Sequence, residues 1–189
     1  MISEKGVKFG DILWCRVPIL LSCLALSDGA GPGAGEVRGQ EPESRYDFLL
    51  GSWEGELEYL DYGDNETRVT LPTWLVVKRS EIGPGLEASF LFEEPDGSTV
   101  EGGDRFYETR EGLVFGELWA VDSWESPAPD GTHRIALSRQ GLDDERPAML
   151  WTVIERSKDR LTLTKTVRYG DGAVFQRNQF RFQLAPVEP

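Results

Sequence analysis

Cysteine and histidine are scarce in this chain of 189 residues. The two cysteines, Cys15 and Cys23, lie near the N-terminus, so residues 28 to 189 contain no thiol. Thiol catalysis, disulfide cross-links and cysteine-ligated zinc are therefore excluded for that part of the chain. The single histidine, His133, leaves few candidates for a nucleophile that is activated by an adjacent base.

Helical patterning is also missing. No stretch of twelve or more residues repeats its apolar residues at helical spacing, and no internal repeat has the length of a solenoid unit. The best helical candidate is RYDFLL at 45–50, where three apolar side chains share one face of a single turn. With 39% hydrophobic and 11% aromatic residues, the chain has enough core for one globular domain.

The first 27 residues have the pattern of a signal peptide. Three basic residues precede the apolar run VPILLSCLAL at 17–26, whose ten residues fall short of the roughly 20 that span a bilayer. Ala25 and Ser27 are small, which suits cleavage after Ser27. We therefore expect an exported protein, periplasmic or secreted, with no transmembrane segment in its mature form.

Two other interpretations of the N-terminus stay open. LLSC at 20–23 also fits a lipobox, in which Cys23 would be acylated and anchor the protein to lipid, although the apolar run continues past that cysteine. An uncleaved anchor or a misread start codon would also explain the run. The following segment, 28–44, is rich in glycine, proline and charge and predicts a flexible linker.

The charge is strongly acidic. The chain carries −13 in total and +1 in residues 1 to 27, which leaves −14 on the remainder. Such a surface repels phosphate backbones and anionic lipid, so we expect no nucleic-acid partner and a soluble monomer.

From residue 45 onward the pattern is that of antiparallel sheet. Short segments of alternating, β-branched or aromatic character are separated by turn residues such as those of YGDNE (62–66), EPDGS (94–98) and YGDG (169–172). We predict strands at 51–61, 67–80, 85–93, 99–109, 113–122, 132–139, 148–156, 161–169 and 172–184.

A meander of this size exposes two unpaired edges unless it closes. We therefore predict an all-β fold over 45–189, an up-and-down antiparallel barrel of about 8–10 strands with a short helical turn before the first strand. Alternation in 51–61 places Trp53, Leu57 and Tyr59 inside the barrel and the glutamates between them outside.

Gly51-x-Trp53 after a helical turn, followed by a meander whose last strand carries arginine, resembles the calycin superfamily and its bacterial secreted lipocalin-like domains. In that group the tryptophan closes one barrel end, and an arginine of the last strand packs on its ring. Arg177 and Arg181 lie about 13 Å apart along a strand, so only one reaches Trp53. Antiparallel pairing of the first and last strands favours Arg181.

Cofactors and metals are not expected. The nitrobindin-like branch of the calycins binds haem through a histidine near the end of the chain, but His133 lies too early for that role. Acidic pairs such as Asp143 with Asp144 lie in predicted turns without the ordered spacing of a calcium loop, so we interpret them as solvated.

Alternation also places polar residues among aromatic ones on the inner face, which is typical of a small-molecule site. Buried charges there need mutual pairing or a ligand with polar atoms. The predicted cavity residues are Trp74, Phe90, Phe92, Tyr107, Glu117, Trp119, Trp151, Lys165 and Arg177.

These patterns favour a non-catalytic protein that binds a small, mostly hydrophobic ligand, with Arg177 or Lys165 at its polar end. One alternative is an isomerase or hydrolase of a hydrophobic molecule that uses Glu117 and His133 as acid and base. Another is an envelope protein-interaction domain without a ligand.

Overall fold

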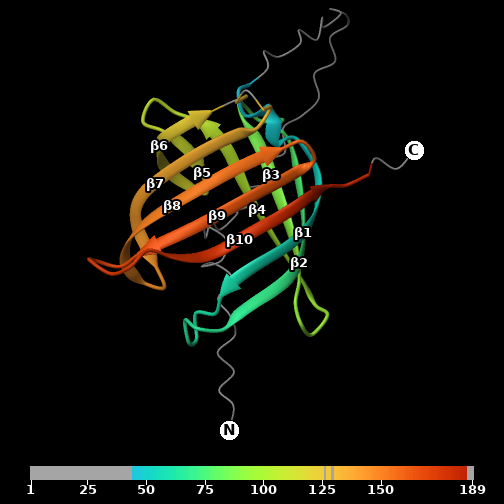
Figure 1. Ribbon diagram of the computed structural model, residues 1–189. Coiled ribbons are helices and arrows are strands. Elements are labelled where there is room, and N and C mark those ends of the chain that lie inside the picture. The colour runs from blue at the N-terminus through green and yellow to red at the C-terminus, as the bar shows by residue number, and fades with distance from the viewer. Residues whose placement is uncertain (1–43, 126, 129, 187–189) are drawn as a thin grey trace, which may run out of the picture.

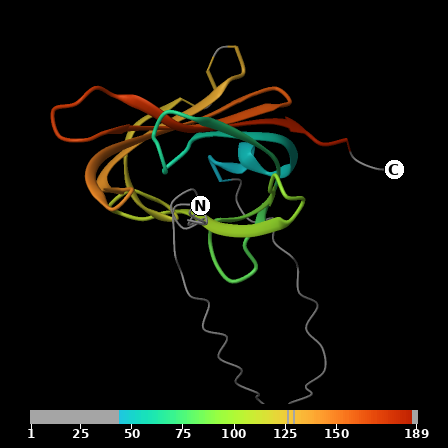
Figure 2. The same cartoon turned by 90° about the horizontal axis from the view of Figure 1, so that it is seen from below.

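A computed structural model of the chain describes residues 44–125, 127–128 and 130–186. Ten antiparallel strands close into one up-and-down barrel in the order β1-β10-β9-β8-β7-β6-β5-β4-β3-β2 (Figure 1). Viewed along its length, the sheet forms a ring (Figure 2). The predicted all-β barrel is confirmed and is compatible with a calycin fold. The predicted signal peptide and nearly all of the linker lie outside the described residues.

The elements follow the chain without a crossover. They are the 3-10 turn η2 (Asp47–Leu49) and the strands β1 (Gly51–Leu60), β2 (Arg68–Arg79), β3 (Leu86–Glu93), β4 (Thr99–Glu108), β5 (Leu113–Phe115), β6 (Glu117–Glu125), β7 (His133–Asp143), β8 (Arg146–Ser157), β9 (Arg160–Arg168) and β10 (Phe175–Leu184).

Turn residues act as their chemistry predicts. Asn65, Gly97 and Gly170 have φ angles of 57°, 81° and 50° in the connections that follow β1, β3 and β9. These left-handed conformations favour Gly and Asn and allow tight reversals. Every hairpin therefore returns the chain beside the strand it has just left, and pairing of β1 with β10 removes the last two edges.

Three predicted strands differ from the observed strands, in two places. The predicted strand 113–122 is divided at Gly116, whose φ is 68°, into β5 and β6, which pair with each other. The predicted strands 132–139 and 148–156 extend toward one another as β7 and β8, joined by Asp144 and Glu145 with φ angles of 51° and 61°. The second difference brings Asp143 into the sheet.

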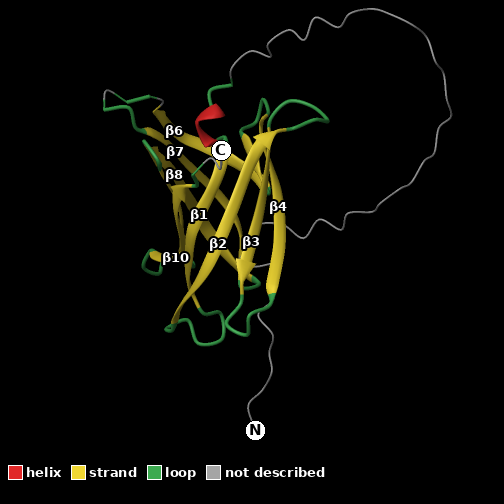
Figure 3. Ribbon diagram, turned by 90° about the vertical axis from the view of Figure 1, so that its right-hand side faces the viewer, coloured by secondary structure: helices red, strands yellow, loops and turns green. Residues whose placement is uncertain are grey.

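Trp53 closes the barrel end beside η2, which caps that end in Figure 3. Its indole is buried and its Nε1 donates a hydrogen bond to the Leu49 carbonyl of η2, at 3.1 Å. The side chain packed on the ring is Arg156 of β8, with Cζ 4.9 Å from the ring centroid. Our expectation that Arg181 would occupy this place is wrong.

A β-bulge explains the position of Arg181. The register between β10 and β9 shifts between Gln176 and Asn178, so Arg177 and Asn178 are both buried. Beyond the bulge the alternation changes phase, and Phe180 and Phe182 face the interior. Arg181 therefore points outward, where it pairs with Glu56 at 3.1 Å.

None of the described helical residues forms a helix long and apolar enough to cross a membrane.

Candidate functional site

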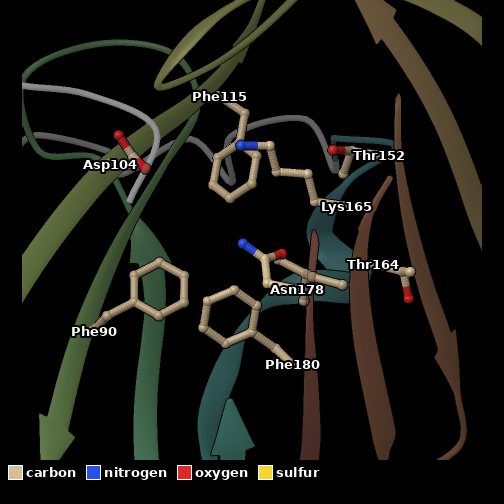
Figure 4. Close-up of a pocket in the computed structure, with 9 residues that line it drawn as sticks. Phe90, Asp104, Phe115, Thr152, Thr164, Lys165, Asn178 and Phe180 are labelled. Carbon is tan, nitrogen blue, oxygen red and sulfur yellow. The ribbon is translucent and has the colours of Figure 1, made fainter. Parts of the chain in front are cut away.

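The barrel interior contains a small cavity with polar and aromatic walls. The centre of a water-sized sphere can move through about 10 Å³ of it, so the cavity has room for roughly one water molecule. β3, β4, β5, β8, β9 and β10 all contribute to it, and Figure 4 shows the amide of Asn178 at the centre of the group among the aromatic rings. The lining residues are Phe90, Asp104, Phe115, Thr152, Leu163, Thr164, Lys165, Asn178 and Phe180.

A second cavity lies beside it, toward η2. It measures about 20 Å³ and is lined only by apolar side chains, including Leu49 of η2. Phe90, Phe115 and Leu163 line both cavities and so separate them. The interior is therefore divided into an apolar half next to η2 and a half that contains polar groups.

Three polar side chains of the first cavity lack hydrogen-bond partners within the described residues. The hydroxyl of Thr152 is fully buried and unpaired. Asn178 is 2% exposed and Asp104 is partly buried, and neither side chain forms a hydrogen bond with a described residue. An unpaired buried polar group costs about 1–3 kcal/mol, so the Thr152 hydroxyl lowers stability unless something in the cavity bonds to it.

Asp104 is the most perturbed acid of the cavity. Burial, with a smaller contribution from the negative charge of Glu117, raises the pKa of its carboxyl from 3.8 to about 7. Near neutral pH the group therefore exists in both forms. The protonated form can donate a hydrogen bond, and the ionised form can accept one.

At the barrel end away from η2, Asp143 joins a buried ionic cluster. Its carboxylate accepts hydrogen bonds from Lys165 Nζ at 3.0 Å, Arg177 Nε at 3.0 Å and the Tyr169 hydroxyl at 2.6 Å. Arg177 also donates to Asn65 Oδ1 at 2.7 Å. The cluster links the ends of β7, β9 and β10 with the loop after β1.

The interpretation of Asp143 as part of a solvated turn is wrong. It is 3% exposed because β7 continues through it, and alternation from Leu137 then aims its side chain inward. Burial tends to raise the pKa of Asp143, but the charge of Lys165, the hydrogen bonds from Tyr169 and Lys165, and the charge of Arg177 outweigh it and lower the pKa. The carboxylate is thus ionised at neutral pH and balances buried positive charge.

The structure brings together some of the predicted cavity residues. Phe90 and Lys165 line the polar cavity. Trp119, Phe92 and Arg177 are buried but line neither cavity.

Three predicted cavity residues, Trp74, Trp151 and Tyr107, are on the outer face, so these predictions are wrong. Trp74 is 38% exposed because the buried residues of β2 are its neighbours Thr73 and Leu75. Trp151 and Tyr107 also have buried neighbours in their strands. The guanidinium of Arg168 lies over the Trp151 ring, and that of Arg105 lies over the Tyr107 ring. Glu117 is on the same face of β6 as the buried Trp119, but 46% of its side chain is exposed, it faces Arg139 at 3.7 Å, and it lines neither cavity.

The acid–base pair of the enzyme hypothesis is not assembled. His133 stacks on Phe48 of η2, with ring centroids 4.6 Å apart. Glu117 begins β6 and pairs with Arg139, six residues along β7 from His133. Neither of the two interior cavities nor the hollow at His133 is lined by both described side chains.

Sequence reasoning missed Asp104, Thr152 and Asn178. Thr152 shares its face with Leu150 and Ile154. Orienting β8 by these aliphatic residues, and not by Trp151, predicts that Thr152 faces the interior. Asp104 follows two glycines, which conceal the alternation of β4. Asn178 alternates with the buried Phe180 and Phe182, a signal that is hidden when β10 is oriented from Phe175, because the bulge between Gln176 and Asn178 changes the phase.

Among the described residues, no group of three or more histidine, cysteine or acidic side chains is arranged to hold a metal ion. In comparisons with known proteins, no family model matches the chain and no curated protein has a significantly similar sequence.

Proposed function

We propose that the chain is an exported, lipocalin-like, non-catalytic protein whose barrel binds a small ligand with an apolar body and one hydrogen-bonding end. The observation that carries the proposal is the buried Thr152 hydroxyl, which has no hydrogen-bond partner among the described residues and lines the first cavity together with the polar side chains of Asp104 and Asn178. A barrel that only had to fill its interior would be more stable with apolar residues there.

The neighbouring charges favour a neutral polar group on the ligand. Asp143 already balances Lys165, and Arg177 is occupied by Asp143, Tyr169 and Asn65. A carboxylate would have to compete with Asp143, whereas a hydroxyl, carbonyl or amide can bond to Thr152 and Asn178 without a charge imbalance. We therefore place the polar end of the ligand, a neutral group, at Thr152 and Asn178 and not at Arg177.

The size of the ligand depends on the residues between the two cavities. Each cavity alone holds about one water molecule. Phe90, Phe115 and Leu163 separate them, and a change of rotamer at these side chains would join the apolar half to the polar half. The ligand we propose occupies the joined space, with its apolar body toward η2.

The test is a binding titration of the full chain with a neutral aromatic probe, N-phenyl-1-naphthylamine, together with mass spectrometry of an organic extract of the purified protein. We expect the probe to fluoresce on binding and an apolar compound of low molecular weight to co-purify. A protein that yields no compound and binds no probe would contradict the proposal.

The substitution Thr152→Val tests whether the ligand binds in the first cavity. The substitution keeps the shape of the side chain and removes the unpaired hydroxyl, so the ligand-free protein should become more stable by about 1–2 kcal/mol while affinity for the extracted compound falls. Thr166→Val on the outer face of β9 is the matched control and should change neither. Equal affinity in Thr152→Val and the parent protein would place the ligand elsewhere.

A further inference from the structure

A separate hollow lies outside the barrel, at the end that η2 and Trp53 close. Its volume is about 750 Å³, within the range of small-molecule sites and far larger than the interior cavities. Residues of η2, the end of β2, the start of β7 and the turn after β8 form it. The side chains used below are Arg45, Phe48, Arg79, His133, Arg156 and Lys158.

The hollow is cationic in a chain that is otherwise acidic. Four of its lining side chains are arginine or lysine and one, Asp47, is acidic, whereas the whole chain carries −13. Two of the cations have carboxylate partners, since Arg79 pairs with Asp47 at 2.5 Å and Arg45 pairs with Glu108. The remaining two are Arg156 and Lys158.

Arg156 near the end of β8 and Lys158 in the turn after it have no carboxylate partner in the part of the chain that the structure describes. Arg156 Nε donates to the Lys158 carbonyl at 3.0 Å, and its NH1 donates to the Phe48 carbonyl. Backbone carbonyls hold the guanidinium in place without neutralising it. Burial lowers the pKa of Arg156, as expected for a cation removed from water without a counter-charge.

An apolar wall stands beside these cations. Phe48 stacks on His133 with an interplanar angle of 13°, and Leu50 lines the same hollow. Burial and the nearby positive charge of Arg156 lower the pKa of His133 below 6.5, so the imidazole is neutral at pH 7. A bound molecule would meet two positive charges on one side and flat, uncharged rings on the other.

We propose that this hollow binds a small organic anion that has an apolar or aromatic part. Its anionic group lies between Arg156 and Lys158, and its apolar part lies against Phe48 and His133. The site is distinct from the barrel interior and does not depend on the function proposed for it. Pairing with the anion supplies the counter-charge that Arg156 and Lys158 lack.

Two probes with one aromatic framework test the proposal on the full chain. 8-Anilinonaphthalene-1-sulfonate carries a sulfonate, and N-phenyl-1-naphthylamine is the same framework without it. We expect the sulfonate to bind at this site with an affinity that falls as salt rises from about 20 to 500 mM, because salt screens exposed charges. Affinity for the uncharged probe should be almost independent of salt.

Lys158→Gln is the main variant because Lys158 is exposed and takes part in the described contacts through its backbone carbonyl, which the substitution keeps. It should weaken sulfonate binding about threefold, the effect of one exposed charge, and leave the uncharged probe unaffected. Arg156→Lys retains the charge and loses the planar donors, and should weaken sulfonate binding about tenfold or more.

Lys78→Gln is the matched control. It removes one positive charge from an exposed position of β2 whose partner is Glu87, outside the hollow. Sulfonate affinity should not change in this variant. The proposal is overturned if Lys158→Gln leaves sulfonate affinity unchanged, or if Lys78→Gln lowers it as much as Lys158→Gln does, since the latter would show only a general effect of net charge.

Discussion

The guanidinium of Arg156 lies over the indole of Trp53, with Cζ 4.9 Å from the ring centroid. The same guanidinium donates to the Phe48 carbonyl of η2 and to the Lys158 carbonyl beyond β8. One side chain from β8 thus connects β1, η2 and the β8–β9 turn at the closed end of the barrel. The resemblance to calycins implied such an arginine on the last strand, but here it comes from two strands earlier.

Arg156→Ala should therefore be much more destabilising than Arg181→Ala. The first removes a stacked cation and two hydrogen bonds to carbonyls, and we expect a loss of about 2–4 kcal/mol in the free energy of unfolding. The second removes exposed ion pairs with Glu56 and Glu58 and should cost less than about 1 kcal/mol. Urea denaturation of both variants measures the difference, and equal losses would contradict this role of Arg156.

Asp143→Asn should destabilise the barrel by about 3–5 kcal/mol, because it leaves Lys165 and Arg177 buried without a counter-charge. Asp144→Asn is the control. Its residue is in the adjacent turn with φ 51°, a conformation that Asn accepts, and it should be nearly neutral. Thermal unfolding at pH 7 compares the two, and similar melting temperatures for both variants would show that the cluster contributes little.

The same cluster predicts a loss of stability in acid. The pKa of Asp143 is lower in the folded protein than its ordinary value of 3.8, so its stabilising contribution is complete above about pH 4 and disappears as the pH falls through the folded value. Urea unfolding from pH 5 to pH 2 should show this decline, and the decline should be smaller in Asp143→Asn. If the free energy of unfolding falls equally between pH 5 and pH 2 in the variant and the parent protein, other carboxyl groups cause the decline.

Asp104 predicts the opposite trend at higher pH. Its pKa rises from 3.8 to about 7 on folding, so the folded state retains a proton that the unfolded state has lost. Stability should fall as the pH rises from about 4 to 7, by a few kcal/mol at most, since one pKa unit corresponds to about 1.4 kcal/mol. Asp104→Asn should remove this slope, and a slope that persists in the variant would exclude Asp104 as its source.

Gly55→Ala should open the seam between β1 and β10. A Cβ at residue 55 would lie 1.9 Å from the Arg181 carbonyl oxygen of the paired strand, so the backbones must separate. We expect a loss of at least about 3 kcal/mol. Gly103→Ala is the control, because its Cβ would meet the Ala88 carbonyl oxygen at an ordinary 3.4 Å. Comparable unfolding midpoints for the two variants would mean that β1 and β10 can move apart at little cost in free energy.

The barrel and most of its turns could be predicted because they depend on local patterns. Alternation in GSWEGELEYL orients β1 correctly, with Trp53 inside. The site could not be predicted to the same extent. Aromatic character suggested that Trp74 and Trp151 faced the interior, but each of these rings covers the outer surface of its strand while its aliphatic or threonine neighbours fill the interior.

The sequence by itself determined the meander and its closure, since the two-residue period of a strand and the conformational preferences of Gly, Asn and Asp in turns act within a few residues. Only the tertiary structure decided the position of the bulge in β10, the pairing of Asp143 with Lys165 and Arg177, and the contact between Arg156 and Trp53. Each of these depends on strands that are distant in the chain and on how tightly side chains fill the closed barrel. No local pattern encodes that information.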